Sequence, residues 1–551
     1  MKTEISRRRF VRHLGLLGAA SSAAITAPTA LAASVARETW LTSPGNPDPD
    51  YVIRRPRGWR LRPTGVDDTA NLRWALRNTR AGGTVKLGRG VFKLARPILV
   101  PDFDGRLIGA GPKQTILTCT DQFSFEIWEA PGGGRDLGEP PPSRFPRSSY
   151  DGSSTLSPPM LIGFFKTPLQ GGENPDDRAN RIEIRDLRCR GAMLGTPWMF
   201  GDEVLCINII NSFDYHNPEF AQVTTRQDVV VTNVEVDGYR TPSFGPFENA
   251  CACITIVGGV VATPNYNLEG DVDGDAFGFV NGGLINVVPA EGDVTVTDCV
   301  YKNCRYGPGV VGYRNSNILF ENNSTDGCRA NCLQMIDIYD SKIAVRDNNL
   351  HCDSFLLPPE LANGATDLPS SLGCVVALQG IGAAVGYPHN VQWLRLAGDP
   401  VAHAAHPEAG PLGTWRPQGP AAAQQKSRLR IVDNSCQSSE SSNTYCFHVF
   451  DANYLAFGLA SVNAVLIDNE CEGSQTCIGL EHINEAIVRR NECSSQAYGI
   501  ELHNSFNNLV VGNSFDFPAG TSGCEIRTLM LGEKIDFSRV VPGAGICAPQ
   551  A

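Results

Sequence analysis

The sequence predicts an all-β solenoid, one elongated domain built by repeating a short unit. The same phrase recurs four times between Leu429 and Phe515: a run of apolar, often β-branched residues that ends at Asn. The last three of these residues, Asn469, Asn491 and Asn513, are 22 positions apart. A fixed period of this size indicates coils that stack to build a shared core. Because the leucine frame and helical side of a leucine-rich repeat are missing, we expect a right-handed parallel β-helix.

Each coil of such a helix carries three short strands, and the repeated phrase is the second of them. We expect Asn at its end because Asn tolerates the left-handed backbone conformation that a sharp turn requires. Similar runs earlier in the chain end at Asp186, Asn233, Asp298, Asn322 and Asp347. Stacked asparagines would hydrogen-bond to one another along the helix axis.

A column of cysteines should accompany the asparagines. Cys436, Cys471 and Cys493 each lie two residues after the Asn of their coil, so the common register stacks them one above another. Free cysteine is among the most buried residue types. We therefore favour a column of small apolar side chains over disulfides or metal ligands.

Residues 1–32 carry the features of an export signal. Ser6–Arg12 contains consecutive arginines, an apolar run follows over Leu14–Ala24, and Ala30–Ala32 offers small residues for cleavage. This order resembles a bacterial twin-arginine signal peptide and is favoured over a basic soluble N-terminus. Such signals export folded proteins, here to the periplasm or the exterior. Folding in a reducing cytosol argues against reading the 18 cysteines as a disulfide framework.

The charge balance excludes several classes of partner. The net charge of the chain is −11, and removing residues 1–32 takes away five Lys or Arg and one Glu, which moves it to −15. An acidic chain without a basic stripe argues against nucleic acid and anionic membranes, and against a polyanion unless a cation bridges. No apolar run after the signal reaches the ~18 residues of a membrane span.

The start of the domain reads as a lead-in followed by a cap. Residues 33–60, rich in proline and arginine, are predicted to be extended. Gly65–Leu76 then combines an Asp/Thr start signal with apolar residues at helical spacing, which predicts a short capping helix. We assign Asp67 and Asp68 to helix capping rather than to a catalytic pair.

Three segments follow that helix: Gly82–Leu94, Pro97–Pro101 and Leu107–Leu117. Their succession resembles the N-terminal cap and first coils of the pectate-lyase-like β-helix superfamily, over about residues 60–118. The resemblance implies a parallel β-helix, usually an extracytoplasmic protein that acts on polysaccharide. We expect the β-helix domain to span 61–540, with a C-terminal tail at 541–551.

Long insertions interrupt this domain. The segment 121–158 is a loop without a core pattern, whereas the others lie between the first and second strands of their coils. They are predicted at 211–228, 258–292, 380–427 and 452–461. Because the same turn of every coil points the same way, these loops should gather on one edge of the rod. Loops of this length are usually functional or disordered, so we expect them to wall a groove beside the first-strand sheet.

In the superfamily that the sequence resembles, substrate lies on the outer face of that first sheet. Strand alternation turns a polar set outward: Asp337, Gln379, His448, Glu481, Glu501 and His503. With coils ~4.8 Å apart, four of these residues are predicted to form one axial column, in the order Asp337, His448, Glu481, Glu501. They are the catalytic candidates, and Gln379 and His503 are the substrate-binding candidates. The competing interpretation is a solvated polar face on an inert rod.

Glu481 and Glu501 are the first catalytic candidates. Each follows a Gly and a branched apolar residue, which suggests one shared register and backbones ~4.8 Å apart. That spacing is close to the ~5–5.5 Å between the carboxyl groups of retaining glycosidases. At such a distance like charges should raise one pKa, so one carboxyl could serve as the acid. His448 would bias which of the two keeps the proton.

A metal site is the remaining candidate. Asp271, Asp273 and Asp275 have the alternating carboxylates of a calcium loop, and we keep them as candidate calcium ligands. The stretch lacks the Gly at the sixth position and the Glu at the twelfth that an EF-hand requires, which favours an acidic surface turn. No other cofactor is indicated.

The resemblance reaches the fold and the substrate class rather than the reaction. The Asn-Thr-Asp, paired Asp and Gly-His-Gly arrangements of polygalacturonases are missing, and the calcium carboxylates and arginine base of pectate lyases have no clear match. We expect an exported carbohydrate-active protein, a polysaccharide lyase or glycoside hydrolase that binds an extended polysaccharide or oligosaccharide. The alternative is a non-catalytic β-helix that binds glycan or builds the envelope, because fold alone does not establish a reaction.

Overall fold

The computed structural model describes most of the strands and the turns between them. The residues described are 48–95, 98–120, 160–166, 175–190, 204–211, 226–237, 251–258, 260–263, 279–280, 283–287, 290–302, 304, 307–328, 332–352, 375–379, 426–438, 445–451, 462–503, 505, 507–521, 523–529 and 546–547. The predicted signal peptide, the loop at 121–158 and most of the other predicted insertions and the tail lie outside these residues.

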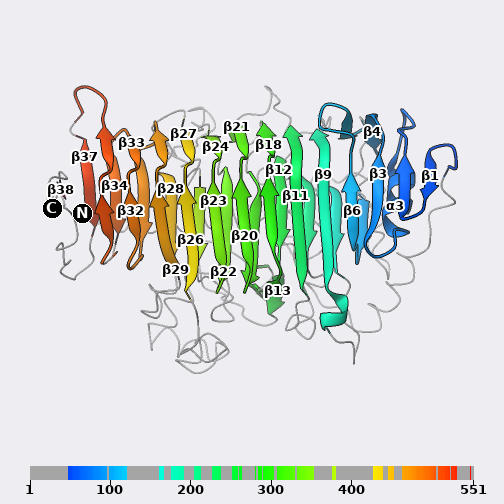
Figure 1. The fold of residues 1–551 in the computed structure, drawn as a ribbon, viewed down its shortest axis with the longest axis horizontal. Coiled ribbons are helices and arrows are strands. Elements are labelled where there is room, and N and C mark those ends of the chain that lie inside the picture. The colour runs from blue at the N-terminus through cyan, green and yellow to red at the C-terminus, as the bar shows by residue number, and fades with distance from the viewer. Residues whose placement is uncertain are drawn as a thin grey trace.

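The predicted parallel β-helix is confirmed. Its strands stack side by side along the long axis of the molecule in chain order, from β1 to β37 (Figure 1). The first strand of each coil joins one 13-stranded sheet. Its members are β5 (Ile98–Pro101), β8 (Met160–Phe165), β10 (Val204–Ile210), β12 (Cys251–Val257), β16 (Ala290–Glu291), β19 (Gly309–Arg314), β22 (Leu333–Tyr339), β25 (Val375–Gln379), β28 (Tyr445–Asp451), β31 (Thr476–Glu481), β34 (Tyr498–His503), β37 (Cys524–Leu529) and β38 (Ile546–Cys547).

The second and third strands of each coil belong to one 22-stranded sheet. The second-strand members are β1 (Val52–Arg55), β2 (Gly58–Leu61), β3 (Gly83–Leu87), β6 (Gly105–Ile108), β17 (Val294–Thr297), β20 (Asn317–Glu321), β23 (Lys342–Arg346), β26 (Ser427–Val432), β29 (Val462–Ile467), β32 (Ile487–Arg489) and β35 (Leu509–Val511). The third-strand members are β4 (Gly90–Leu94), β7 (Thr115–Cys119), β18 (Val300–Lys302), β21 (Ser324–Cys328), β24 (Asn349–Cys352), β27 (Ser435–Ser438), β30 (Glu470–Glu472), β33 (Glu492–Ser494) and β36 (Ser514–Asp516). Two long strands, β9 (Asn180–Arg190) and β11 (Gln227–Asp237), run through both positions.

The turn between second and third strands differs in one respect from the prediction. In the repeated phrase the left-handed residue is the one before the asparagine, as at Asp468 (φ 57°) and Arg490 (φ 55°), and not the asparagine itself. The earlier turns do place a predicted residue there, for example Asp186 and Asn233. The asparagines of the repeated phrase are therefore kept for their side chains, not for their backbone.

Those side chains form an asparagine ladder, which we define as Asn323, Asn348, Asn434, Asn469, Asn491 and Asn513. Each Nδ2 donates to the Oδ1 of the next member at 2.8–3.0 Å. Each backbone N–H donates to that same Oδ1 at 2.9–3.1 Å. The second amide hydrogen reaches a carbonyl of the preceding coil, as from Asn491 to Leu466. Buried amides are thus satisfied on both sides, which is the condition for burying them without penalty.

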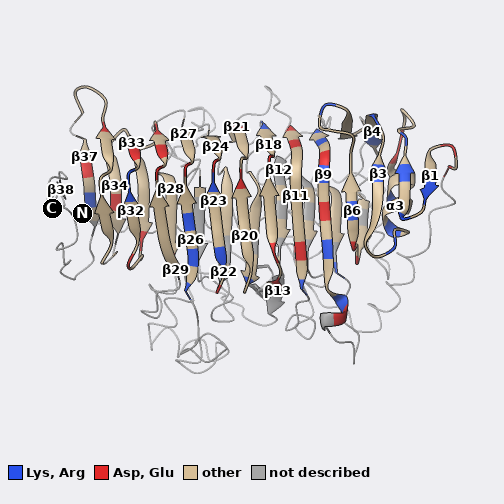
Figure 2. Ribbon diagram, viewed as in Figure 1, with Lys and Arg blue, Asp and Glu red and all other residues tan. Residues whose placement is uncertain are grey.

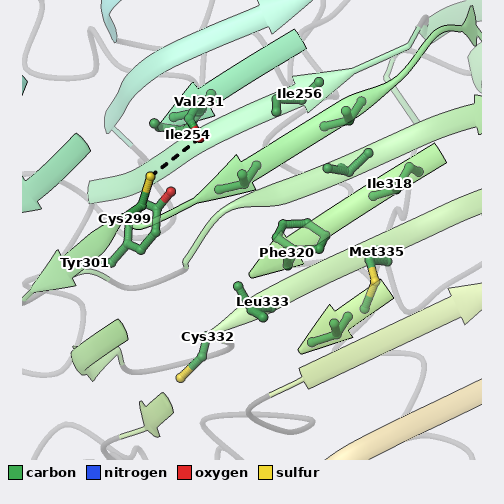
Figure 3. Close-up of a cluster of buried hydrophobic side chains, with 14 of the residues drawn as sticks. Val231, Ile254, Ile256, Cys299, Tyr301, Ile318, Phe320, Cys332, Leu333 and Met335 are labelled. Carbon is green, nitrogen blue, oxygen red and sulfur yellow. Dashed lines mark hydrogen bonds between the residues drawn. The ribbon is translucent and has the colours of Figure 1, made fainter. Parts of the chain in front are cut away.

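Branched and aromatic side chains fill the interior between the sheets. Figure 3 shows one stretch of this core, where Ile254 and Ile256 of β12 face Phe320 of β20 and Tyr301 of β18. Cys299 lies in the same cluster, and its thiol contacts the Val231 carbonyl at 3.8 Å. The predicted cysteine column is confirmed, because Cys436 pairs in register with Cys471, and Cys471 with Cys493.

The capping helix is confirmed as α3 (Thr69–Arg77), which closes the first coils. Within the predicted extended lead-in, β1 and most of β2 pair as an antiparallel hairpin. Of the two aspartates assigned to capping, Asp67 accepts from the Thr69 N–H at 2.9 Å. Asp68 instead accepts from the backbone of Thr64 and Lys93, so its buried carboxylate ties the helix to the first coil.

A small antiparallel sheet lies within the predicted 258–292 insertion. It orders β13 (Val260–Thr263), β15 (Gly283–Val287) and β14 (Phe279–Val280), and β13 lies at the long edge of the rod (Figure 1). A one-turn 3-10 helix, η1 (Pro175–Arg178), precedes β9. No described helix is long and apolar enough to cross a membrane.

Charges and cysteines follow the sequence-based expectation. Along the described strands Lys and Arg are interspersed with Asp and Glu, as on β9, rather than gathered in a basic stripe (Figure 2). Cys524 is disulfide-bonded, whereas core cysteines such as Cys471, Cys477 and Cys493 form no disulfide. A single disulfide-bonded cysteine is not the framework of bridges that the sequence analysis argued against.

Candidate functional site

The candidate site lies on the outer face of β28, β31, β34 and β37. Alternating side chains of these strands fill the core: Phe447, Val449, Ile478, Leu480, Ile500 and Leu502, each less than 5% exposed. The intervening positions carry His448, Glu481, Glu501 and His503, as predicted. Packing of the inner set fixes the backbone from which the polar set projects.

The predicted single column of catalytic residues is wrong. Glu501 pairs in register with Gly479, and Glu481 pairs with His503. Two rows result, one in which His448, Gly479, Glu501 and Arg527 follow one another, and one with Phe450, Glu481 and His503. Gln334 pairs with Val376, and Val376 pairs with His448, so Gln334 rather than Asp337 continues the first row.

The error was a two-residue shift. The prediction placed Gly479 beside Gly499, the glycines that precede each glutamate. In the structure Ile478 instead pairs with Ile500, and Leu480 pairs with Leu502. A shift of two keeps every side chain on its own face, so alternation alone cannot detect it.

The correction changes the geometry of the glutamate pair. Glu481 and Glu501 are one coil and two residues apart, which places their Cα atoms at roughly 8 Å, from a ~4.8 Å strand spacing and ~3.3 Å rise per residue. The predicted match to the ~5–5.5 Å carboxyl separation of retaining glycosidases therefore fails. The separation of the two carboxyl groups, which distinguishes retaining from inverting enzymes, is set by how the side chains project from these Cα atoms.

Three imidazoles surround the Glu481 carboxylate. His448 Nε2 lies 3.5 Å from Oε2, His503 Nδ1 lies 3.4 Å from Oε1, and His482 Nε2 lies 3.9 Å from Oε1. The rings also support one another, because His482 packs edge-on against Phe450 and lies 6.0 Å from His503 between centroids. The backbone N–H of His482 donates to the backbone carbonyl of His503 at 2.8 Å, which links the two neighbouring coils.

This surrounding sets the ionisation of Glu481. Burial alone would raise the pKa of its carboxyl. Hydrogen bonds from His448 and His503, together with their charges, outweigh burial and hold the pKa of Glu481 well below its usual range. The ionised form of the Glu481 side chain is therefore favoured, and its carboxylate lies within 3.4–3.9 Å of the imidazoles around it.

Glu501 occupies a different environment, built around Tyr445. The Tyr445 ring stacks on His448 with centroids 4.5 Å apart and covers Gly479. A Cβ at Gly479 would lie 2.4 Å from a ring carbon of Tyr445, so only glycine admits the ring there. The phenol oxygen then lies 3.4 Å from Glu501 Oε1, and Arg527 Nη1 lies 3.8 Å from Oε2.

The ionisation of Glu501 is shifted the other way. Burial raises the pKa of its carboxyl, and the nearby Arg527, His503 and Tyr445 offset that increase only in part. Burial likewise raises the pKa of Tyr445 well above its ordinary value, so its hydroxyl stays a hydrogen-bond donor. One carboxyl of the pair is held ionised and the other is held toward its acid form.

The other predicted residues divide into two groups. Asp337 on β22 and Gln379 on β25 lie on strands of the first sheet, but their side chains are outside the described part of the structure. Asp271, Asp273 and Asp275, the calcium candidates, lie outside the described residues altogether. The predicted groove walls fall mostly outside them as well.

Sequence reasoning missed His482, Tyr445 and Arg527. His482 follows the end of β31 and adopts a left-handed backbone (φ 57°), so strict alternation assigned it no face. Tyr445 was missed because its ring reaches across Gly479 from the neighbouring coil. That glycine, at an outward position inside β31 (Thr476–Glu481), was the available signal for a close approach.

Within the described residues, only one group of His, Cys, Asp or Glu brings three ligand atoms within 4.8 Å of one another. It is Cys471, Cys477 and Cys493 in the core, and not the histidine cluster. The histidines around Glu481 lie 3.4–3.9 Å from its carboxylate oxygens.

No protein-family model matches the chain, and no curated protein matches it. Solved structures that it resembles include the catalytic domain of a GH87 alpha-1,3-glucanase in complex with nigerose, at 10% identity, covering 89% of this chain and 69% of that one, with a TM-score of 0.34. A periplasmic alginate epimerase matches at 8% identity, over 91% and 73% of the two chains, with a TM-score of 0.33. A surface adhesin of Streptococcus pneumoniae matches at 12% identity, over 85% and 93%, with a TM-score of 0.37.

Proposed function

We propose that this protein is an exported glycoside hydrolase that cleaves a neutral glycan with inversion of configuration. The observation that carries the proposal is the pair of glutamates whose environments push their pKa values apart, Glu481 downward and Glu501 upward. Such divergence is how one site supplies an acid and a base at the same pH. Inversion further requires that the two carboxyl groups, whose Cα atoms lie roughly 8 Å apart on the diagonal, are far enough apart to admit a water molecule.

Glu501 is the general acid in this scheme. Its protonated carboxyl would donate to the glycosidic oxygen as the bond to the anomeric carbon breaks, which is the role a buried carboxyl with a raised pKa can fill. The Tyr445 hydroxyl, 3.4 Å from Oε1, fixes the orientation of the carboxyl before and after proton transfer.

His503 and Glu481 together supply the base. An anion with so low a pKa is a poor base by itself, but a carboxylate beside an imidazole orients the ring and stabilises the imidazolium that forms. His503 is one-fifth exposed, 3.4 Å from Glu481, and would take the proton of the attacking water. Of the two buried histidines, His448 contacts the other carboxylate oxygen, Oε2, and His482 lies near the same oxygen as His503, Oε1.

A polysaccharide lyase is the second candidate, and Arg527 is the observation that favours it. Its guanidinium is one-third exposed and packs on the Tyr498 ring, 4.4 Å from the centroid. There it could neutralise the carboxylate of a uronic acid while His503 removes the neighbouring carbon-bound proton. The net charge of −11 and the two glutamates oppose a polyanionic substrate, so we rank hydrolysis first.

A polysaccharide panel separates these possibilities. The mature protein is incubated with neutral and uronic-acid polysaccharides and followed by reducing-sugar release and by ultraviolet absorbance. Hydrolysis gives reducing ends alone, whereas a lyase also leaves an unsaturated sugar that absorbs. Product anomers followed by NMR then test inversion. Binding of a glycan without either product would instead support a non-catalytic glycan-binding protein or an envelope structural protein.

Export is the remaining part of the proposal. The consecutive arginines at Arg7 and Arg8 support the twin-arginine route, with cleavage after Ala32 and a periplasmic or extracellular destination. Replacing both arginines by lysine should strand the precursor in the cytoplasm, as followed by fractionation and immunoblotting. Undiminished export of that variant would contradict the route.

A further inference from the structure

Several cysteine thiols converge inside the C-terminal coils, away from the site described above. Cys471 on β30 and Cys493 on β33 come from third strands, whereas Cys477 on β31 comes from a first strand. Their three Sγ atoms lie within 4.8 Å of one another, and the residues are at most 2% exposed. Sulfur atoms from two walls of the rod thus meet at one interior corner.

This arrangement is more than the column that the sequence predicts. Stacking alone would group Cys471 and Cys493 with Cys436, their neighbour in register. The convergent group leaves Cys436 out and takes in Cys477 from the 13-stranded sheet, which the chain enters at β31 after the short turn that follows β30. A column of apolar side chains does not require that cross-wall approach.

A fourth thiol lies beside the group. Cys446 on β28 lies between Tyr445 and Phe447, which pair with Thr476 and Ile478 of β31. It therefore lies beside Cys477, one coil earlier in the chain. It is fully buried, and its thiol interacts with those of Cys471 and Cys477. Its Sγ also lies 3.3 Å from the Ser474 hydroxyl, which holds the side chain in place.

We propose that Cys446, Cys471, Cys477 and Cys493 form a structural zinc site. Zinc binds four thiolates tetrahedrally at ~2.3 Å, which sets sulfurs about 3.8 Å apart. For Cys471, Cys477 and Cys493, whose Sγ atoms lie within 4.8 Å of one another, shifts of about 1 Å or less reach that spacing. Cys446, whose thiol interacts with those of Cys471 and Cys477, would supply the fourth ligand. Soft thiolate ligands in tetrahedral array select zinc over calcium or magnesium.

Burial dictates how the site would behave. The thiols have no exposed surface through which a chelator can compete, so the ion would enter as the coils close and leave when they open. Zinc should then resist EDTA in the native protein and be released in denaturant. A metal bound only to surface carboxylates or histidines would be stripped by EDTA at once.

Metal content tests the proposal directly. Full-length mature protein produced in zinc-supplemented cells is dialysed against EDTA, and its zinc is measured by mass spectrometry. We expect about one ion per chain, released together with reactive thiols on unfolding. Cys477→Ser should reduce zinc content at least tenfold. Cys352→Ser, a matched buried cysteine outside the four ligands, should leave it unchanged.

A second measurement covers the case in which Cys477→Ser does not fold. The wild-type protein is refolded with cobalt(II), and tetrahedral thiolate ligation would give intense visible bands with thiolate-to-cobalt charge transfer in the near ultraviolet. Protein that keeps no zinc after EDTA and gives no such spectrum on refolding would overturn the site and leave a cluster of neutral thiols. Equal zinc content in the Cys477 and Cys352 variants would overturn it as well.

Discussion

Two parts of the same coils follow opposite rules. At the turn after each second strand, six consecutive coils place the same residue and repeat the same contacts at 2.8–3.0 Å, from Asn323 to Asn513. On the outer face of the first sheet, four consecutive coils place His448, Gly479, Glu501 and Arg527 at one register position. The backbone is equally regular in both.

The difference separates structural from chemical demands. A residue that must satisfy its copy in the next coil cannot change in one coil alone, so the asparagine ladder repeats. A residue that meets a ligand has no such constraint and changes from coil to coil. In a solenoid, the position that does not repeat on an otherwise regular sheet is therefore the place to look for function.

The largest expected effect is on catalysis. Glu481→Gln and Glu501→Gln should each lower turnover on the substrate found in the panel by about a hundredfold or more, as expected on loss of a general acid or base. Steady-state kinetics at a temperature where all variants are folded measures this effect. Glu492→Gln, on the exposed outer surface of β33, is the matched control. Full activity in both site variants would move the search to Asp337 and the predicted insertions.

The ladder should respond through stability and not through activity. Asn491 is fully buried, donates to Asn513 and Leu466, and accepts from Asn469. Leucine at this position leaves buried partners unpaired and should lower the free energy of unfolding by about 1–3 kcal/mol for each group. Denaturant titration measures the change, with the exposed Asn349→Leu as control. Equal midpoints for the two variants would show that the ladder is not structural.

The opposite environments of the two glutamates should also appear in the pH dependence of stability. The folded pKa of Glu481 is depressed, so its stabilisation is present above the unfolded value of about 4.3 and is lost as pH falls. The raised pKa of Glu501 makes its ionisation destabilising at neutral pH. At pH 7 Glu481→Gln should melt below wild type, and Glu501→Gln at or above it.

Those differences should shrink as the pH approaches about 3, below the unfolded value. Melting curves from pH 7 to pH 3 give the comparison. If both variants shifted the melting temperature in the same direction at pH 7, the two sites would not be electrostatically distinct.

The smallest effect concerns the alkaline limb of the rate profile. Tyr445→Phe keeps the ring over Gly479 but removes the hydroxyl that lowers the pKa of Glu501. Glu501 would then keep its proton to higher pH, so the alkaline limb of the pH profile of kcat/KM shifts to higher pH. Arg527→Met should move it further in the same direction, because the arginine charge is the larger of the two lowering influences. A shift of the alkaline limb to lower pH in either variant would contradict the assignment of Glu501 as the acid.

Periodicity and strand alternation were sufficient to predict the fold. The run that ends in Asn predicted the coils, the ladder and the cysteine column, because each depends on residues at one spacing within the chain. Alternation also assigned His448, Glu481, Glu501 and His503 to the outer face. These inferences do not require the residue-by-residue pairing register between strands of neighbouring coils.

The assembly of the site needed that precision. Glu481 meets His503 and not Glu501 because register follows inward packing of Ile478 on Ile500, a choice that the outward residues do not record. His482 enters through a left-handed turn residue, and Tyr445 enters across a glycine. Each of these contacts joins residues of different coils through a local exception to the regular repeat.

The asparagine ladder also allows whole coils to be gained or lost in evolution. Between Asn469 and Asn491, and again between Asn491 and Asn513, 22 residues begin and end with the same amide contacts. A duplication or deletion of one such segment would rejoin donor to acceptor without a new turn or a new core. The length of the rod is thus free to drift by whole coils, while the chemistry stays fixed in the few coils where the outer face departs from repetition.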